Sequence, residues 1–155
     1  MIVLLPVAEA AAVAEDADQP IHIRADAAEI DEARGLATYR GNVRMDQGTL
    51  RVTAEVMTIE IADEQVVKIT AEGDRAHYQQ RLERDRSDVS ADARTIVYYT
   101  QEERVELIGA AQLSQDGNEF SGETIRYDMR AGKVDAKSST DGGVRMILQP
   151  AKPKQ

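Results

Sequence analysis

The stretch Asn42-Val43-Arg44-Met45-Asp46 alternates strictly between polar and apolar side chains. The same period of two recurs at 50–53, 57–61 and 67–70, and again at 125–127 and 144–146. Successive side chains of a β-strand point to opposite faces, so this pattern is typical of strands with one buried face. No window keeps the apolar i, i+3, i+4, i+7 stripe of an amphipathic helix. From Ile21 onward the sequence therefore predicts an all-β fold.

Short polar breaks separate these runs about every ten residues, as hairpin turns would. They lie at 31–35, 46–48, 62–65, 101–104, 116–118 and 130–132. This spacing predicts that sequential strands pair in a long antiparallel meander. The longer polar stretch from Gln79 to Asp88 is interpreted as a solvated loop. Its three arginines (Arg81, Arg84 and Arg86) leave an anion site as the alternative, which the interleaved acidic residues disfavour.

The sequence also contains an internal repeat. Ala25-Asp26-Ala27 recurs as Ala91-Asp92-Ala93 with an offset of 66 residues, and Gly41-Asn42-Val43 recurs as Gly109-Ala110-Ala111 with an offset of 68. Gly73 stands between these two glycines. Glycines that recur after an apolar run predict a bend or bulge at the same place in each layer. Stacked repeats of this kind favour an open roll over a closed barrel.

Composition excludes several classes of function. The chain has 28 acidic and 19 basic residues, a net charge of -9, which argues against a nucleic-acid ligand. It has no cysteine, so disulfides and thiolate chemistry are excluded. Its two histidines, His22 and His77, fall on the polar parity of their strands. No catalytic triad, metal-ligand spacing or phosphate loop is present, so the sequence predicts no enzyme, no metal site and no cofactor.

The two ends of the chain differ from the rest in composition. Residues 1–14 are largely apolar and end in Ala12-Val13-Ala14, the small-x-small form of a signal-peptidase site. A disordered, alanine-rich tail is the alternative. We predict a partial signal peptide at 1–14, a single β-jellyroll domain at 19–149 and a flexible tail at 150–155.

Several segments resemble one known family. Gln19-Pro20-Ile21-His22-Ile23, Tyr39-Arg40-Gly41-Asn42-Val43 and Gln47-Gly48 look like the opening repeat of the LptA/OstA family of lipopolysaccharide transport proteins. The stretch from Gly122 to Asp128 is similar to the second half of that family. The resemblance covers residues 19–150. It implies an open, twisted antiparallel β-jellyroll with a groove-like apolar interior, and localisation in the periplasm.

The resemblance also implies a function and partners. Members of the family bind lipopolysaccharide and pass it from the inner-membrane export complex to the outer-membrane translocon. The implied partners are an LptC-like inner-membrane protein, the N-terminal domain of an LptD-like outer-membrane protein, and further copies of the chain stacked head to tail. Two alternatives remain: a membrane-anchored, LptC-like protein of the same fold, and a structural β-solenoid without a ligand.

The charge of the chain restricts how such a ligand is held. Because both the chain and the sugar head of lipopolysaccharide are acidic, the acyl chains must be the main handle. Burying one methylene contributes about 0.8 kcal/mol, so several sealed chains would never leave on a useful timescale. An open-sided groove that covers the chains only partly is the expected solution.

The family resemblance selects Ile21, Ile23, Tyr78 and Tyr98 for the groove, and strand parity adds further residues. The full predicted lining is Ile21, Ile23, Val43, Met45, Val52, Ile59, Tyr78, Ile96, Tyr98, Val105, Leu107 and Phe120. These residues are equally expected as core, and in a carrier the two roles share one face. Unpaired edges at the first and last strands are predicted to dock partners. The edge residues are Ile21, Ile23 and Asp26 at one end, and Val144, Met146 and Leu148 at the other.

Overall fold

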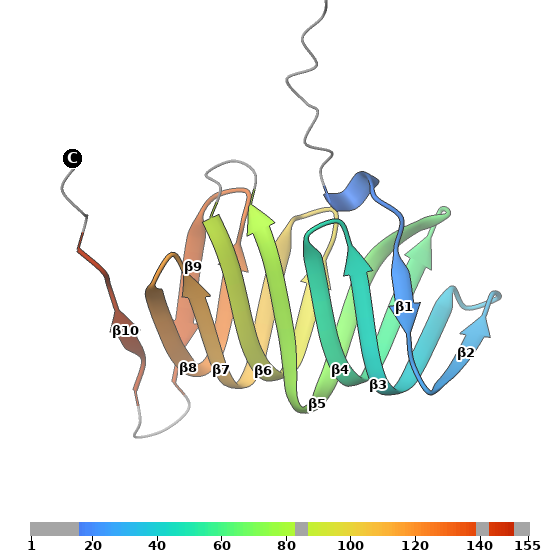
Figure 1. Cartoon of the computed structure of the whole chain (residues 1–155), viewed down its shortest axis with the longest axis horizontal. Helices are drawn as coiled ribbons and strands as arrows, with labels where there is room; N and C mark the ends of the chain where they lie inside the picture. The colour runs from blue at the N-terminus through green and yellow to red at the C-terminus, as the bar shows by residue number, and fades with distance from the viewer. Residues whose placement is uncertain (1–15, 83–86, 139–142, 151–155) are drawn as a thin grey trace, which may run out of the picture.

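The computed structural model describes residues 16–82, 87–138 and 143–150 (Figure 1). It is an all-β structure with one 3-10 turn, η1 (Asp16–Asp18). The strands are β1 (His22–Arg24), β2 (Ala27–Asp31), β3 (Leu36–Gln47), β4 (Leu50–Ala62), β5 (Gln65–Leu82), β6 (Ser87–Tyr99), β7 (Arg104–Gln115), β8 (Asn118–Asp128), β9 (Lys133–Lys137) and β10 (Arg145–Ile147). The predicted signal peptide and most of the predicted tail lie outside the described residues, so the proposed domain boundaries remain predictions.

All ten strands belong to one antiparallel sheet. Its order is β1-β3-β4-β5-β6-β7-β8-β10, with β2 paired to β3 and β9 paired to β8. Each of the long strands β3 to β8 pairs with its neighbour in sequence, as the predicted meander requires. Among the described residues, β1 and β10 lie at opposite ends of the sheet, so the predicted open, antiparallel β-jellyroll is confirmed (Figure 1).

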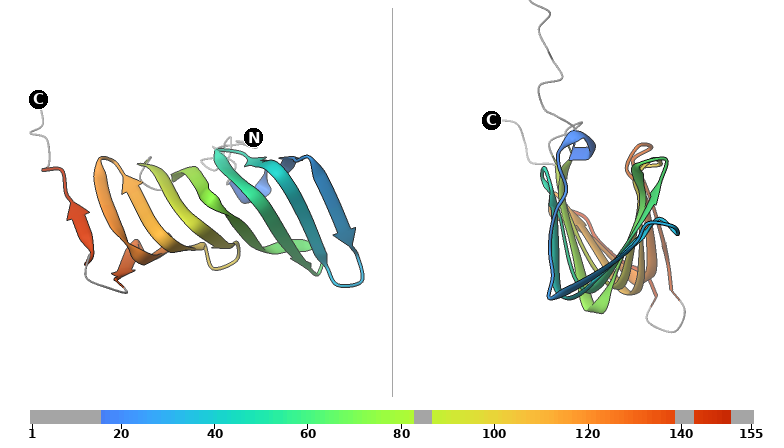
Figure 2. Two further views of the ribbon diagram at one scale, coloured as in Figure 1. Left: turned by 90° about the horizontal axis from the view of Figure 1, so that it is seen from below. Right: turned by 90° about the vertical axis from the view of Figure 1, so that its right-hand side faces the viewer.

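Every long strand bends near its middle, so the single sheet forms two arms. The first arm contains residues 22–24, 43–47, 50–54, 77–82, 87–92, 111–115, 118–122 and 145–147. The second arm contains residues 27–31, 36–40, 56–62, 65–72, 95–99, 104–108, 124–128 and 133–137. Seen end-on, the arms form a V that we call the trough (Figure 2). The side of the trough at the hairpin tips is its mouth.

The bends lie at the glycines that the sequence singled out. The pairing register shifts between Arg40 and Val43, between Glu72 and Ala76, and between Ile108 and Ala111. Gly41 and Gly109 adopt φ values of 81° and 88°, a region that a side chain disfavours. The predicted bend at these positions is therefore what turns one arm into the other.

The structure corrects the offset of the repeat. Ala27 pairs with Arg40, and Thr95 pairs with Ile108, so the first strands of the two copies are also 68 residues apart rather than 66. The match between Ala25-Asp26-Ala27 and Ala91-Asp92-Ala93 therefore does not join structurally equivalent positions. Strand pairing, which depends on the bends, sets the true equivalence.

The predicted loop from Gln79 to Asp88 is also wrong over most of its length. Strand β5 continues to Leu82 and β6 begins at Ser87, with residues 83–86 outside the description. Gln80 and Leu82 keep the inward parity of Tyr78, and Gln80 pairs with Val89. Arg81 lies on the outer face, 3.3 Å from Asp88, whereas Arg84 and Arg86 fall outside the described residues.

Candidate functional site

The inner face of the trough consists of apolar rows that run across the strands. On the first arm, the pairing register aligns one residue from each strand: Ile23, Met45, Val52, Tyr78, Ala91, Leu113, Phe120 and Met146. The row is continuous because every pair of neighbours is in direct register. It follows the long axis of the molecule rather than any single strand.

The second arm carries two matching rows. The row nearer its hairpin tips contains Ile30, Ala37, Ile59, Ile69, Tyr98, Val105, Tyr127 and Val134. The row nearer the bend contains Ala28, Tyr39, Met57, Ala71, Ile96, Leu107, Ile125 and Ala136. Most of these side chains are aliphatic, and the interior residues of the rows form one hydrophobic cluster.

The structure places the predicted lining residues together in this cluster. Val43, Met45, Val52, Ile59, Tyr78, Ile96, Tyr98, Val105 and Leu107 are buried, and Ile21, Ile23 and Phe120 pack against them half-buried. Sequence reasoning omitted equally central members, including Met57, Ile69 and Leu113. Their strand parity identifies them, but the register across strands is needed to see that they complete the rows.

The two arms meet through their own side chains. The rings of Tyr78 and Tyr98 lie 5.9 Å apart between centroids, and these residues are only 1% and 9% exposed. Burial raises the pKa of Tyr98 to about 12, with further increases from the carboxylates of Glu103 and Asp16. Burial likewise raises the pKa of Tyr78 well above 10.0. A chain-like ligand entering here would have to replace contacts that the two arms now make with each other.

A rim of glutamines lies on the inner side of the first arm at its hairpin tips. Gln47 and Gln115 are the last residues of β3 and β7, and Gln80 lies two residues before the end of β5. Gln47 and Gln80 are the buried polar side chains of the described residues. The Nε2 of Gln47 donates to the carbonyl of Gln19 over 3.1 Å, and the hydroxyl of Tyr127 donates to Gln115 over 3.2 Å. The sequence hinted at this rim only through the repeat of Gln47 and Gln115.

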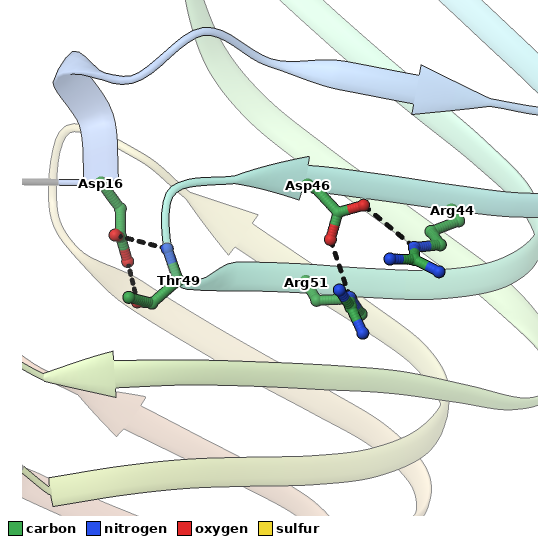
Figure 3. A network of polar contacts seen from close by, with 5 residues as sticks. All are labelled: Asp16, Arg44, Asp46, Thr49 and Arg51. Atoms are coloured by element: carbon green, nitrogen blue, oxygen red, sulfur yellow. Dashed lines mark hydrogen bonds and ion pairs between the residues drawn. The ribbon is translucent and has the colours of Figure 1, made fainter.

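The turn η1 lies at the mouth, against the tip of the β3–β4 hairpin (Figure 2). One carboxylate oxygen of Asp16 accepts from the Thr49 N–H over 2.8 Å, and the other accepts from the Thr49 hydroxyl over 2.7 Å (Figure 3). The second oxygen also accepts from Nε2 of Gln80 over 2.8 Å. We call these donors of Thr49 and Gln80 the cradle. Sequence reasoning missed it because Gln80 lies 64 residues from Asp16.

The outer face is polar and charged. Asp46 joins Arg44 at 2.9 Å and Arg51 at 2.7 Å (Figure 3). On the same arm, the Nδ1 of His77 lies 2.9 Å from Asp92. The predicted outward direction of His77 is thus what the structure shows, and further ion pairs on the outer face join Lys68 to Glu60 and Arg126 to Glu106.

The two ends of the trough expose apolar residues of the inner rows. Ile30 is 65% exposed at one end and Met146 is 55% exposed at the other. Of the predicted edge residues, Ile23 lies in β1 and Met146 in β10, while Val144 and Leu148 flank β10 and are exposed. Ile21 flanks β1, and Asp26 sits at the bend between β1 and β2. Sequence reasoning missed that β2 and β9 are the corresponding edges of the second arm.

The described residues contain no group of three or more His, Cys, Asp or Glu side chains placed to hold a metal ion. No helix within the described ranges has the length and apolar character needed to cross a membrane.

Fold and inner face together define a class: an open antiparallel β-jellyroll whose continuous apolar rows run from one exposed end to the other. A family model described as LptA/(LptD N-terminal domain) LPS transport protein matches residues 22–133. The chain belongs to this family of lipopolysaccharide transport proteins.

Individual relatives agree with the family. The lipopolysaccharide export system protein LptH of Pseudomonas aeruginosa is 35% identical over 154 residues, covering 94% of this chain and 88% of that protein. LptA of Escherichia coli K12 is 30% identical over 142 residues, covering 90% of this chain and 76% of that protein. The crystal structure of LptH, a periplasmic component of the lipopolysaccharide transport device, superposes with a TM-score of 0.80 at 34% identity, covering 87% of this chain and 99% of that one.

Proposed function

We propose that this chain carries lipopolysaccharide across the periplasm by taking its acyl chains between the two arms of the trough. The observation that carries the proposal is the set of continuous, mostly aliphatic rows, which run the length of the molecule and remain apolar at both exposed ends. Acyl chains match such rows in shape and polarity. The described residues offer no comparable apolar surface on the outer face.

The packed state of the inner face suggests how binding remains reversible. Residues such as Met45 and Met57 are fully buried against neighbours from the other strands. An acyl chain that enters exchanges these contacts for its own, so the net gain is smaller than that of filling an empty cavity. Flexible methionines adapt readily to such repacking.

The proposal is tested by comparing two neighbouring tyrosines that point to opposite faces. Tyr98 belongs to an inner row, whereas Tyr99 lies on the outer face, with the Arg104 guanidinium 4.2 Å from its ring centre. We expect a photoreactive phenylalanine analogue at position 98 to capture lipopolysaccharide in cells, and the same analogue at 99 to capture none. Equal capture at both positions, or none at 98, would contradict the proposal and favour a structural β-solenoid.

An entrance substitution gives a second test. Ile23 is a half-buried member of the first-arm row at its end, so Ile23→Asp places a charge where water reaches it. We expect weaker lipid capture from a roll that remains folded, as measured by circular dichroism and co-purified lipid. Ile108→Asp is the matched control, because Ile108 is 42% exposed on the outer face. If both variants bind lipid as the parent does, the first-arm end is not an entrance.

The ends of the trough support docking to further copies or to similarly folded domains, as LptC-like and LptD-like partners would provide. Inside the chain, the last strand of the first copy, β5, pairs with the first strand of the second copy, β6. In the repeat, β9 and β10 together correspond to β5, and β1 and β2 together correspond to β6. The β5–β6 pairs Tyr78–Ala91 and Ile69–Tyr98 are thus a template for Met146 against Ile23 and Val134 against Ile30 of a second copy. Such head-to-tail contacts do not close and build a filament.

This stacking is tested with engineered disulfides, because the chain has no cysteine. Ile30→Cys combined with Val134→Cys should give a ladder of oxidised oligomers on a non-reducing gel. Ile108→Cys with Val134→Cys is the control, since Ile108 lies on the outer face. A ladder of equal strength from the control would show random collision instead of stacking.

A further inference from the structure

The cradle around Asp16 is held in place by groups other than Asp16. The Thr49 hydroxyl accepts from the Arg81 N–H over 3.1 Å, and of the two acceptors for its own hydrogen the Asp16 carboxylate, at 2.7 Å, is nearer than the Arg81 carbonyl, at 3.3 Å. The carbonyl oxygen of the Gln80 side chain accepts from the Tyr78 hydroxyl, which directs Nε2 toward the mouth. The donors are therefore oriented before any anion arrives, the arrangement that strengthens oxyanion binding.

The backbone next to the cradle leaves room for an anion. Gly48 precedes Thr49 with φ of 60°, and a Cβ at that position would lie 2.4 Å from an Asp16 carboxylate oxygen. A side chain there would push the anion away from the Thr49 N–H. All the donors are neutral, so the site recognises an anion by hydrogen bonds and not by net charge.

The cradle adjoins the inner rows at the mouth. Its Gln80 is hydrogen-bonded to Tyr78, whose ring contacts Tyr98 of the opposite arm. The Asp16 carboxylate is close enough to raise the pKa of both tyrosines, although burial is the larger cause. A lipid with its acyl chains between the arms would place its polar head at the mouth of the trough, beside the cradle.

We propose that the cradle is a phosphate subsite, and that Asp16 is an intramolecular occupant which a phosphate monoester on the bound lipid's headgroup displaces. This inference rests on the proposed function. Phosphate oxygens accept the same hydrogen bonds as a carboxylate. Asp16 competes at the high effective concentration of a tethered group, so a phosphate displaces it only when its own lipid chains are already held by the inner face.

Substitutions at η1 test the displacement. Asp16→Ala empties the cradle and should tighten binding of bisphosphorylated lipid A about tenfold, the value of a charged hydrogen bond. The affinity for chemically dephosphorylated lipid A with the same acyl chains should not change. Asp18→Ala is the matched control, because it removes the same charge from the same turn without touching the cradle. Asp16→Ala combined with Gln80→Leu should lose the gain.

Other outcomes overturn the inference. If Asp16→Ala and Asp18→Ala bind phosphorylated lipid equally, the cradle does not select phosphate. If Asp16→Ala tightens binding of both lipids to the same degree, η1 merely covers the mouth. Asp16→Asn, which keeps the side-chain shape, guards against misfolding: it should reproduce the gain in part, and a weaker affinity than the parent's would also count against the inference.

Inorganic phosphate separates the cradle from the lipid. Added to Asp16→Ala, millimolar inorganic phosphate should shift the NMR signals of the Thr49 amide and the Gln80 side-chain amide. It should shift neither in the parent, where Asp16 fills the site. Absence of a shift in Asp16→Ala overturns the phosphate subsite. A shift in that variant, together with no lipid capture at position 98 in the parent, would instead show that the cradle exists and that the proposed lipid carriage is wrong.

Discussion

The two copies of the repeat, β1–β5 and β6–β10, place equivalent residues in different surroundings. Tyr78 and Met146 are 68 residues apart and occupy the same place in the first-arm row, beside Val52 and Phe120. Tyr78 is 1% exposed because β6 covers it, whereas Met146 is 55% exposed at the end of the stack. Position along the stack, rather than residue type alone, decides whether an inner-row side chain is core or edge.

The strands at the centre of the stack also differ from those at its ends in whether they are continuous. The central strands β5 and β6 run unbroken through the bend, while their counterparts at the ends are divided into β9 with β10 and β1 with β2. A strand with partners on both sides forms hydrogen bonds to two neighbours, twice as many as a strand at the edge. These bonds hold the strand in extended conformation where its pairing register changes. The terminal strands lack one partner, which leaves their edges available for a second copy.

The largest expected effect tests whether both copies contribute equally to the core. Met45 and Leu113 occupy equivalent positions in the two copies, and both lie in the first-arm row. Their side chains are 0% and 2% exposed. We expect Met45→Ala and Leu113→Ala each to lower the free energy of unfolding by about 2–5 kcal/mol, through lost burial and the cavity that remains. Urea denaturation measures both.

Met146→Ala provides the control at the edge of the same row. Because Met146 is largely exposed, it should cost under about 0.5 kcal/mol in the monomer. A loss there as large as that of Met45→Ala would mean that the end of the stack is covered in solution. A small loss at Leu113 would mean that the second copy is less well packed than the first.

A smaller effect is expected at the bends. Gly41→Ala and Gly109→Ala both force a side chain into positive φ, which costs about 1–2 kcal/mol. A Cβ at Gly41 would also lie 2.5 Å from a carboxylate oxygen of Asp26, whereas the nearest atom at Gly109 is the Arg94 Cβ at 3.1 Å. The first copy should therefore lose more stability than the second in thermal or urea unfolding.

Gly132→Ala isolates the backbone strain, because Gly132 has φ of 66° with nothing within 4 Å of the added Cβ. The expected order of destabilisation is Gly41, then Gly109, then Gly132. If Gly109→Ala were the most destabilising, the close approach of Asp26 to Gly41 would not determine the cost of a side chain at the first bend.

The smallest effect concerns the outer face, where Asp46 of the first copy has the neutral Ser114 as its counterpart. The hydrogen bond from Arg51, opposed in part by burial and supported by Arg44, lowers the pKa of Asp46 below 3.8. A lowered folded-state pKa stabilises the fold above the unfolded value and loses that contribution as the pH falls through the folded value. Asp46→Asn should cost a few tenths of a kcal/mol at neutral pH.

The acid dependence distinguishes this pair from simple packing. Below the folded pKa of Asp46, the parent and Asp46→Asn should have the same free energy of unfolding by urea denaturation. Ser114→Asn is the control and should show a difference from the parent that does not vary with pH. A constant penalty for Asp46→Asn across the same range would show that its ion pairs contribute nothing.

Much of the inner face could be predicted from alternation. A period of two assigns each residue of a strand to one face, which is why Val43, Met45 and Val52 were expected in the interior where the structure places them. Glycines after apolar runs also predicted the bends, because positive φ has few other solutions. The expected loop at Gln79–Asp88 was wrong because polar side chains there belong to the rim and the outer face of continuous strands.

The sequence by itself determined the antiparallel meander, the inward side of each strand and the sites of the bends, since these depend on neighbours a few residues apart. Only the tertiary structure decided the register across strands, the 68-residue equivalence at the start of the repeat, and the contact between Asp16 and Gln80. Those features join residues that are distant in sequence, and their geometry depends on how the two arms pack. Local pattern carries no information about such distances.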